Sequence, residues 1–170
     1  MNLKKYIREI PNWPKKGILF YDITPLLQNA KAFRATIDKL AKPYAKKKID
    51  VVVGIDARGF ILAAALAYKL KTGLAIIRKK GKLPWKTWRA DYALEYATNT
   101  IEMHQDAIKS GQKVLIVDDV LATGGTMEAT VKLVKKLRGK IVGIAFLSEL
   151  GFLNGRKKLK DQKVTSLITY

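Results

Sequence analysis

The segment from Val114 to Thr126 constrains the fold more than any other part of the chain. It reads VLIVDDVLATGGT, a β-branched apolar run followed by two acids and a turn rich in threonine and glycine. A short apolar run bounded by polar residues is typical of a buried strand. Beyond the turn, residues 127–137 carry apolar side chains at helical spacing. A buried strand that leads through a glycine turn into an amphipathic helix indicates an α/β fold.

The same two patterns alternate along most of the chain. Phe60 to Leu70 is almost wholly apolar, which suits a buried helix, and Ile49 to Val53 is a β-branched run that suits a buried strand. Strands alternating with helices predict a three-layer α/β domain with a mostly parallel central sheet flanked by helices. We expect helices at 3–10, 33–44, 60–70, 101–108 and 127–137, and strands at 49–53, 74–77, 113–117 and 141–147.

One long stretch fits neither pattern. Residues 78–100 contain Trp85, Trp88 and several lysines, and they show no sustained period. A stretch of this length inside a small domain is either functional or disordered. Aromatic residues among charged ones favour a flexible flap at about residues 79–100. Because there is no internal repeat or second-domain boundary, we expect a single domain over residues 1–170.

Charge is the unusual feature of the composition. The chain has 33 Lys and Arg against 14 Asp and Glu, a formal charge of +19. Such a protein attracts polyanions, although an anionic substrate or a lysine-rich solvated surface accounts for the same charge.

The chain has no cysteine, and therefore neither disulfide nor thiolate chemistry. No apolar run approaches the roughly 20 residues of a membrane span. With no signal-peptide pattern at the start, we expect a cytoplasmic protein without a membrane partner.

The turn after the strand carries the chemistry. Ligands of open α/β sheets bind beyond the carboxyl ends of the strands, which is where Asp118 and Asp119 fall. Gly124 and Gly125 permit close approach to the backbone, and the start of the following helix favours an anion. The acids would repel a phosphate, so they suit the vicinal hydroxyls of a ribose, directly or through a bound cation. Neither the nucleotide P-loop pattern nor the dinucleotide fingerprint is present. An acidic turn that only caps a helix is the alternative, and the length of the motif favours a phosphorylated ribose.

At these residues the sequence resembles the type I phosphoribosyltransferases, and the likeness extends to the branch of that family that uses adenine. The matching segments keep the family's order and cover most of the chain. They are PKKGILFYDITPLL (14–27), GIDARGF (54–60), IRKKGKLP (77–84), YALEY (92–96), HQDAI (104–108), VLIVDDVLATGGTM (114–127) and FLNGRKKL (152–159).

The resemblance implies the fold, the reaction and the partners. The fold would be that of the type I phosphoribosyltransferases, with a small N-terminal hood at about residues 1–30. The reaction would convert adenine and phosphoribosyl pyrophosphate to AMP and pyrophosphate in purine salvage. It would use Mg²⁺ that is held mainly through substrate and water, with no protein ligand directly assigned. A homodimer is expected because the family forms one, and nucleic acid would bind only nonspecifically through the basic charge.

The resemblance also assigns roles to residues around the sugar and the leaving group. Asp118 and Asp119 would face the ribose, and Arg58 would lie near the base; these three and Glu95 are the candidate catalytic residues. Arg78 and Lys82 would meet pyrophosphate, with Arg78 reaching across a dimer interface. The 5-phosphate would bind to Ala122, Thr123, Gly124, Gly125 and Thr126, and pyrophosphate to the loop of Asp56, Ala57, Arg58 and Gly59.

Adenine would be recognised in the hood and the flap. Phe20 matches an aromatic residue that stacks on the base, and the backbone beside it, at Leu19, would read the base edge. Glu95 matches a carboxylate proposed as general acid or base at a purine nitrogen, and Tyr96 follows it. A flap that closes would exclude the water that would otherwise hydrolyse the sugar donor. We expect the single histidine, His104, to be a structural or a surface residue.

Four positions depart from the family's pattern, and two other functions stay open. The departures lower charge in the hood or alter the flap and its surroundings, and none touches the phosphate-binding turn. Transfer to a 6-oxopurine is one alternative, and a nucleic-acid-binding regulator on the same fold is the other. The departing residues are Tyr21, Trp85, Ala97 and Gly151.

Overall fold

The computed structural model describes residues 1–93 and 98–170 of the chain. These residues form two compact units, Met1–Lys39 and Leu40–Tyr170. The boundary falls within the helix α2 (Ala30–Ala41). Among the residues that the structure describes, none of the helices is long and apolar enough to span a membrane.

The larger unit is built on a mixed sheet with the strand order β5-β6-β4-β3-β7-β8-β9. Strands β4, β3, β7, β8 and β9 run parallel to one another, whereas β6 pairs antiparallel with both β4 and β5. The mostly parallel central sheet predicted from the sequence is therefore confirmed. The strands are β3 (Val51–Ile55), β4 (Gly73–Lys79), β5 (Thr87–Ala93), β6 (Thr98–His104), β7 (Lys113–Leu121), β8 (Lys140–Glu149) and β9 (Val164–Thr169).

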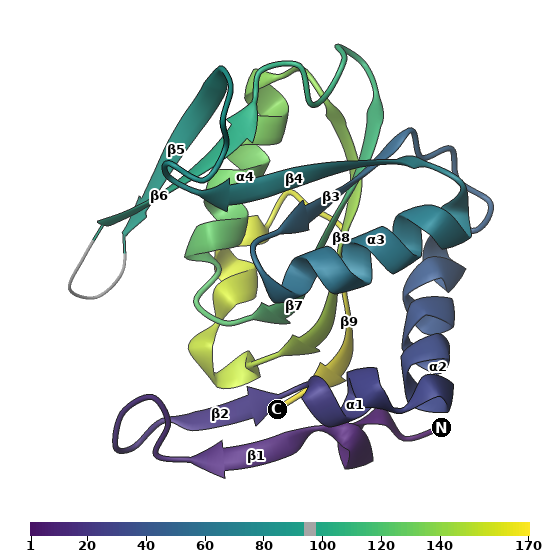
Figure 1. The fold of residues 1–170 in the computed structure, drawn as a ribbon, viewed down its shortest axis with the longest axis vertical. Helices are drawn as coiled ribbons and strands as arrows, with labels where there is room; N and C mark the ends of the chain where they lie inside the picture. The colour runs from purple at the N-terminus through teal and green to yellow at the C-terminus, as the bar shows by residue number, and fades with distance from the viewer. Residues whose placement is uncertain (94–97) are drawn as a thin grey trace. The chain divides into compact units, whose positions relative to one another are not determined.

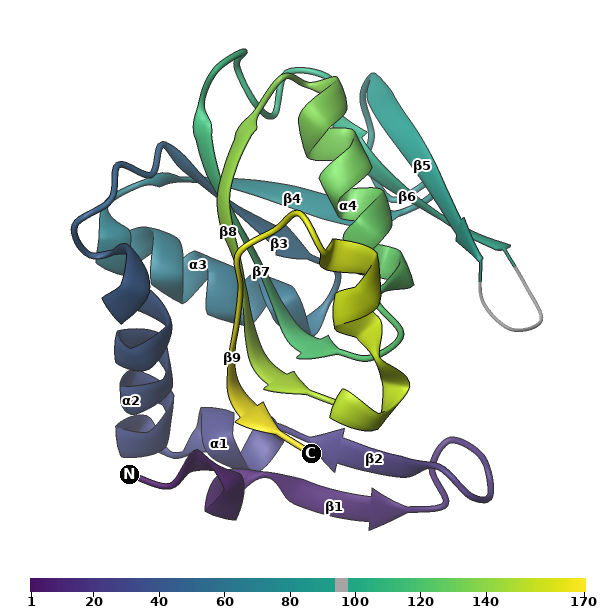
Figure 2. The same ribbon diagram turned by 180° about the vertical axis from the view of Figure 1, so that it is seen from behind.

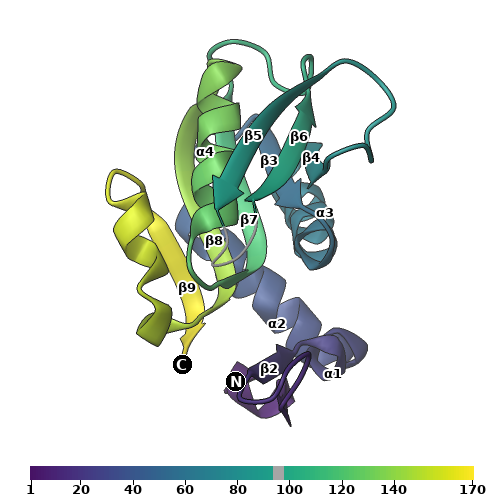
Figure 3. The ribbon, with the colours of Figure 1, turned by 90° about the vertical axis from the view of Figure 1, so that its left-hand side faces the viewer.

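Two helices cover the sheet from opposite faces (Figure 3). They are α3 (Arg58–Leu70) and α4 (Gly125–Lys136). Successive side chains of a strand point to opposite faces, so a strand buried on both faces is apolar throughout. Val53 accordingly joins the buried cluster that includes Leu133 of α4, and Val52 is equally buried. The three-layer arrangement of Figure 1 thus follows from the apolar runs of the sequence. Short 3-10 helices complete the unit: η2 (Lys42–Tyr44), η3 (Gly151–Leu153) and η4 (Gly155–Leu159).

Residues 98–104 form a strand, so the predicted helix at 101–108 is wrong. Ile101 and Ile108 lie seven residues apart, a spacing compatible with a helix. In the structure Ile101 and Met103 are both buried, at the period of two that a strand requires. Between them, the buried Glu102 accepts hydrogen bonds from Arg89 and from the backbone of Gly81.

Part of the stretch predicted to lack regular structure is also a strand. Residues 87–93 form β5, which pairs with β6 from Thr87 opposite His104 to Ala93 opposite Thr98. Alternation is hidden in this strand because polar residues such as Arg89 and Asp91 are stabilised by partners on β6. The two strands project beside α4 as a hairpin in Figure 1.

The smaller unit begins with a 3-10 helix, not the predicted helix over 3–10. The short helix η1 (Leu3–Tyr6) is followed by β1 (Arg8–Pro11), which pairs antiparallel with β2 (Leu19–Asp22). Antiparallel pairing with the next strand along the chain overrides the local helical spacing in this segment. A short helix, α1 (Thr24–Gln28), leads into α2.

Candidate active site

Parallel pairing of β3 with β7 brings two loops to one edge of the sheet. Gly54 of β3 lies opposite Val117 of β7, so the residues that follow them emerge side by side. Asp118 and Asp119, the acid pair, lie within the last part of β7, because pairing with β8 extends this strand to Leu121. The strand is therefore longer than the predicted 113–117, and the acids stand on its carboxyl end.

Arg58 joins the first turn of α3 to the acid pair. Its Nη2 lies 2.8 Å from Oδ2 of Asp119, and the Asp119 side chain is only 7% exposed. Arg58 and the acids border a cleft of about 220 Å³. The cleft is lined by Ile55, Asp56, Ala57, Arg58, Ile77, Arg78, Lys79, Tyr92, Ile101, Asp118, Asp119 and Thr126.

Burial makes the acid pair reluctant to ionise. Loss of solvation raises the pKa of Asp118 well above its usual value, and the negative charge of Asp119 raises it further. Loss of solvation also raises the pKa of Asp119, and this outweighs the opposing effect of Arg58. The backbone N–H of Asp119 donates to Oδ1 of Asp118 at 2.9 Å, which fixes the orientation of that carboxyl. Two buried, adjacent carboxyls of this kind favour a hydroxyl donor or a cation as their ligand.

Gly59 lets α3 approach the acid pair. A Cβ built on Gly59 would stand 2.6 Å from Oδ1 of Asp118 and 3.3 Å from the Val117 carbonyl oxygen. Such a distance is shorter than van der Waals contact, so no larger residue fits without moving the acid. The family resemblance singled out Gly59, and in this chain a glycine is required there because any side chain would collide with Asp118.

The residues Ala122–Thr126, called here the glycine loop, border a second cleft of about 160 Å³. Gly124 caps the start of α4 with a φ of 80°, a left-handed conformation that favours glycine. Asp118 and Thr126 line both this cleft and the first, so the two adjoin. The start of α4 supplies partial positive charge to the second cleft, next to the carboxyls of the first.

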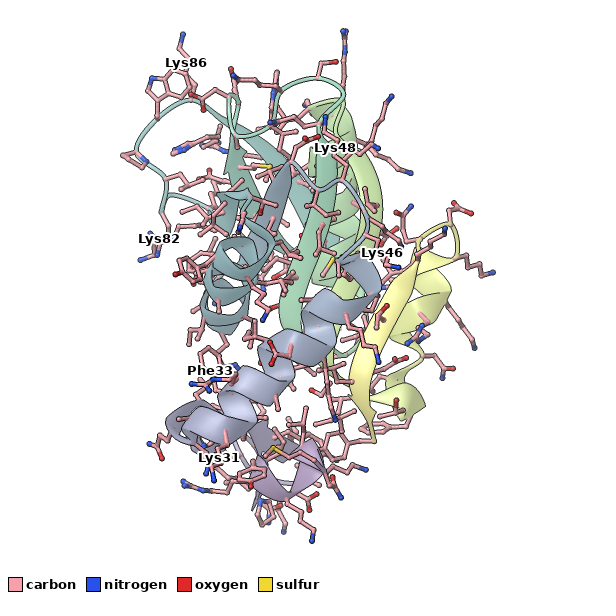
Figure 4. All side chains as sticks on the ribbon, turned by 90° about the vertical axis from the view of Figure 1, so that its right-hand side faces the viewer. Lys31, Phe33, Lys46, Lys48, Lys82 and Lys86 are labelled. Atoms are coloured by element: carbon pink, nitrogen blue, oxygen red, sulfur yellow. The ribbon has the colours of Figure 1, made fainter. Side chains whose placement is uncertain are left out.

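Arg78 and Asp56 form an ion pair across the sheet edge. Nε of Arg78 donates to Oδ2 of Asp56 at 3.1 Å, and Nη1 donates to the Lys82 carbonyl oxygen at 3.2 Å. Arg78 therefore bridges the end of β3 and the loop after β4. Lys82 itself is exposed on that loop, as Figure 4 shows.

The remaining predicted residues fall in the smaller unit or outside the described part of the chain. Phe20 and Leu19 lie on β2; the ring centroid of Phe20 is 4.3 Å from that of Trp13, and Leu19 is 40% exposed. Glu95 and Tyr96, with the departure Ala97, lie outside the described residues.

Several residues of this region escaped the sequence analysis. Tyr92 and Ile101 line the first cleft. Tyr92 falls within the family-like segment YALEY, whereas no local pattern distinguishes Ile101 from a core residue. Glu149 and Arg156 form an ion pair beside the glycine loop, with Nη2 and Oε2 2.7 Å apart. Arg156 falls within the family-like segment FLNGRKKL, which was the available signal, whereas nothing in the sequence singles out Glu149.

The described residues do not bring three carboxylates or histidines together as a metal site. The acid pair offers oxygen ligands next to a cleft that suits an anion. This donor set fits Mg²⁺, which typically takes one or two carboxylates together with substrate phosphates and water.

Comparison with known proteins agrees with this geometry. Residues 23–169 match the family model described as a phosphoribosyl transferase domain. Adenine phosphoribosyltransferase of Geobacter metallireducens is 60% identical over 168 residues, covering 99% of this chain and 98% of that protein. The crystal structure of adenine phosphoribosyltransferase from Thermoanaerobacter pseudethanolicus has a TM-score of 0.96 at 52% identity, covering 99% of this chain and 98% of that chain.

A further solved structure carries ligands. The Saccharomyces cerevisiae adenine phosphoribosyltransferase, complexed with an imino-altritol bisphosphate and adenine, has a TM-score of 0.92 at 39% identity. It covers 97% of this chain, and 96% of its own length is matched. The fold is thus that of a transferase with the type I phosphoribosyltransferase architecture. The chain belongs to the phosphoribosyltransferase family, in its adenine phosphoribosyltransferase branch.

Proposed function

We infer that this protein transfers the phosphoribosyl group of phosphoribosyl pyrophosphate to adenine, giving AMP and pyrophosphate in purine salvage. The observation that carries the inference is the pair of adjoining clefts. One is lined by Asp118 and Asp119, and the other is lined by the glycine loop. These clefts occur in a chain that is 60% identical to an adenine phosphoribosyltransferase over nearly its whole length. The enzyme is therefore a pentosyltransferase.

The glycine loop is the proposed site of the 5-phosphate. Its start-of-helix position favours an anion, and Thr123 and Thr126 add hydroxyl donors without adding charge. Asp118 and Asp119 then face the ribose. Their oxygens accept hydrogen bonds from sugar hydroxyls, and their charge stabilises the positive charge that develops on the ring as the glycosidic bond breaks.

The leaving pyrophosphate is proposed to bind to the loop Asp56–Gly59 together with Arg78 and Lys82. Arg58 and Arg78 are already oriented by carboxylates, at 2.8 Å and 3.1 Å respectively, so little reorganisation is needed to receive an anion. Mg²⁺ would be held by the substrate, by water and by the acid pair, and it would neutralise charge on the leaving group.

Recognition of the base is proposed to use residues of the hood and residues of the flap. Phe20 would stack on adenine, with the backbone beside Leu19 at the base edge. Glu95 would hold or move a proton at a purine nitrogen, and Tyr96 would lie next to it. These roles rest on the family resemblance, as does the division into hood, flap and a single functional domain.

We also propose that the protein forms a homodimer through α3. Ile61, Tyr68 and Leu74 are exposed by 44%, 89% and 45%. Ile61 and Tyr68 lie seven residues apart, which places them on one face of the helix. Leu74 lies on β4, and large apolar side chains left exposed in this way are typical of a protein interface. The cytoplasmic location stays a prediction.

A purine competition assay tests the function. The protein is mixed with Mg²⁺, phosphoribosyl pyrophosphate and equal amounts of adenine, hypoxanthine, guanine and xanthine, and the nucleotide products are separated. We expect AMP to dominate. If a 6-oxopurine nucleotide forms as fast as AMP or faster, adenine is not the preferred substrate. If the folded protein forms no nucleotide, the proposed activity is refuted.

A further inference from the structure

The segment after β8 packs its backbone directly against the glycine loop. Figure 2 shows η3 and η4 returning alongside α4. A Cβ on Gly124 would lie 2.6 Å from the carbonyl oxygen of Gly155, and a Cβ on Gly155 would collide with the carbonyl oxygen of Ala122. The two glycines therefore permit a backbone contact that no other residue pair would allow. The position of Gly155 fixes the space that the glycine loop can occupy.

A second link holds the start of the same loop. The backbone N–H of Leu150 donates to the carbonyl oxygen of Leu121 at 2.9 Å. Leu121 immediately precedes the glycine loop, and Leu150 immediately follows β8. The glycine loop is thus braced at Leu121 and at Gly124 by one segment, residues 149–156.

Arg156 ties this bracing segment to the sheet. Its Nε donates to both carboxylate oxygens of Glu149, at 2.7 Å and 2.9 Å, and its Nη2 donates to Oε2 at 2.7 Å. Nη1 donates to the Val164 carbonyl oxygen at 3.1 Å. Ser166 donates a further hydrogen bond to Oε2 of Glu149 at 2.8 Å. A guanidinium held by a carboxylate in this forked way is fixed in orientation as well as in position.

The pair lies outside the two clefts. The side chain of Glu149 is 9% exposed, whereas that of Arg156 is 49% exposed. Neither Glu149 nor Arg156 is among the described residues that line the clefts. Because Gly155 is the immediate neighbour of Arg156, the contacts of the guanidinium restrain the backbone against which Gly124 rests.

We propose that Glu149 and Arg156 are positioning residues for the 5-phosphate site, acting through Gly155 on the glycine loop. This inference rests on the function proposed above. A loop held in its binding conformation loses little entropy when phosphate binds, so the ion pair favours affinity for the phosphorylated sugar. Adenine binding does not depend on it.

Binding of ribose 5-phosphate to the whole chain, measured by calorimetry, tests the proposal. Arg156→Met should weaken ribose 5-phosphate binding by about 10-fold to 100-fold, since an error of about 1 Å in a binding group costs that much. Arg156→Lys keeps the charge but loses the fork, and should fall between Arg156→Met and the unchanged protein. Lys157→Met removes the same charge from the same short helix, and should change binding less than about twofold.

Steady-state kinetics separate positioning from general destabilisation. In the positioning case, the KM for phosphoribosyl pyrophosphate rises while the KM for adenine stays constant. Equal changes in both, tracking a loss of folded protein by circular dichroism, would assign the pair a purely structural role and overturn the proposal. If Arg156→Met does not fold, Arg156→Lys and Glu149→Gln decide the question by the same measurements.

The unchanged protein separates the two inferences. If it fails to bind ribose 5-phosphate, the proposed function itself fails. If it binds ribose 5-phosphate and folded Arg156→Met binds within twofold as tightly, the function stands and the positioning role is refuted.

Discussion

The acid pair on β7 is held at a cost in folding free energy. The folded pKa of Asp118 and that of Asp119 both lie above the value of an unfolded aspartate, about 3.9. The native state therefore binds protons more tightly than the unfolded state. The contribution of this pair to the free energy of unfolding falls as pH rises from about 4 through the folded pKa values. Substrate-binding sites often retain an unfavourable contribution to folding free energy of this kind, because the function requires the carboxyls at that position.

Asp118→Asn should therefore stabilise the ligand-free protein while reducing turnover. At pH 7.5 we expect a gain of about 1 kcal/mol, or about 2–4 °C in Tm, because an amide costs less to bury than a carboxylate and because the repulsion from Asp119 is removed. The gain should shrink as pH falls below about 4, where Asp118 becomes protonated in the unfolded state as well as in the folded state. The kcat should fall on the order of 100-fold, because stabilisation of the developing positive charge is lost. Thermal melts at several pH values and initial rates check this.

Asp161→Asn is the control for charge, since Asp161 is exposed. It should leave both Tm and kcat nearly unchanged. A Tm for Asp118→Asn below that of the unchanged protein at pH 7.5 would contradict the argument that the acid pair is strained.

Gly59→Ala tests the close approach of α3 to the acid pair. The added Cβ would stand 2.6 Å from Oδ1 of Asp118, so either the helix or the carboxyl must move. We expect a loss of about 1–3 kcal/mol in stability and at least about a 10-fold loss in kcat/KM. Gly73→Ala is a matched control, because its Cβ would meet nothing closer than 3.6 Å. Similar effects of the two substitutions in melts and rate assays would show that the contact at Gly59 is unimportant.

Residues whose role is local were predictable, and residues that act through distant partners were not. Asp118, Asp119 and Gly124 stand in one continuous motif, so the sequence places them together. Glu149 and Arg156 are recognisable only once β8 and β9 are side by side, because their contacts with Val164 and Ser166 depend on that pairing. The same limit applies to Arg78 and Asp56, whose ion pair depends on the register of β3 and β4.

Among the secondary-structure elements, the sequence concealed the β5–β6 hairpin as well as β1. Ile101 and Met103 of β6 are buried, but the charged Glu102 between them is buried too, with Arg89 as its partner, and so the period of this strand is obscured. The helices α3 and α4 and the strands β3, β7 and β8 were predictable because hydrophobic burial alone determines them. Besides pairing with β6, strand β5 of the hairpin also contacts α4. Nζ of Lys136 lies 3.9 Å from the centroid of the Trp88 ring.

Lys136→Met should loosen this hairpin without unfolding the larger unit. A cation–π contact at an exposed site contributes about 0.5–1 kcal/mol, so amide hydrogen exchange in residues 87–92 should accelerate about threefold. Lys132→Met is the matched control, one turn earlier on α4, since Lys132 pairs instead with Glu128 at 3.5 Å. Exchange that responds equally to both substitutions would mean that the contact with Trp88 does not hold the hairpin.

For the molecule as a whole, the exposed face of α3 predicts its assembly. Tyr68→Asp places a charge at the centre of the proposed interface, where desolvating it would be costly. We expect the unchanged protein to sediment as a dimer and Tyr68→Asp to sediment as a monomer, with circular dichroism unchanged because Tyr68 is 89% exposed. Lys69→Asp, on the neighbouring face, serves as the control. If Tyr68→Asp still sediments as a dimer, the interface does not include this face of α3.

Part of the net charge of +19 lies near the start of β7, at the end of that strand remote from Asp118 and Asp119. A cleft of about 540 Å³ is lined there by Lys46, Lys47, Lys48, Lys113 and Lys163, with Asp161 as the carboxylate among its lining residues. Figure 4 shows Lys46 and Lys48 in the chain that follows α2. Lysines on flexible stems neutralise phosphates without reading bases, so the cleft favours nonspecific binding of polyanions.

Duplex DNA should accordingly bind weakly and without sequence preference. We expect a Kd of about 10⁻⁴–10⁻⁶ M at physiological salt, with log affinity falling linearly as log salt rises. Replacing Lys46, Lys47 and Lys48 with Gln should reduce that slope by about 2–3, since each phosphate contact contributes about 0.9. Formation of AMP should be unchanged, because these lysines do not border the acid pair or the glycine loop.

A second triple variant decides whether the cleft or the total charge is responsible. Lys15, Lys16 and Lys31 are exposed lysines of the smaller unit, and replacing them with Gln removes the same charge. If the cleft binds the duplex, this variant keeps the original slope. If both triples lower the slope equally, contacts are spread over the whole surface. Affinity that differs between duplex sequences at constant salt would instead support a nucleic-acid-binding regulator, because base readout requires contacts that a cluster of lysines does not supply.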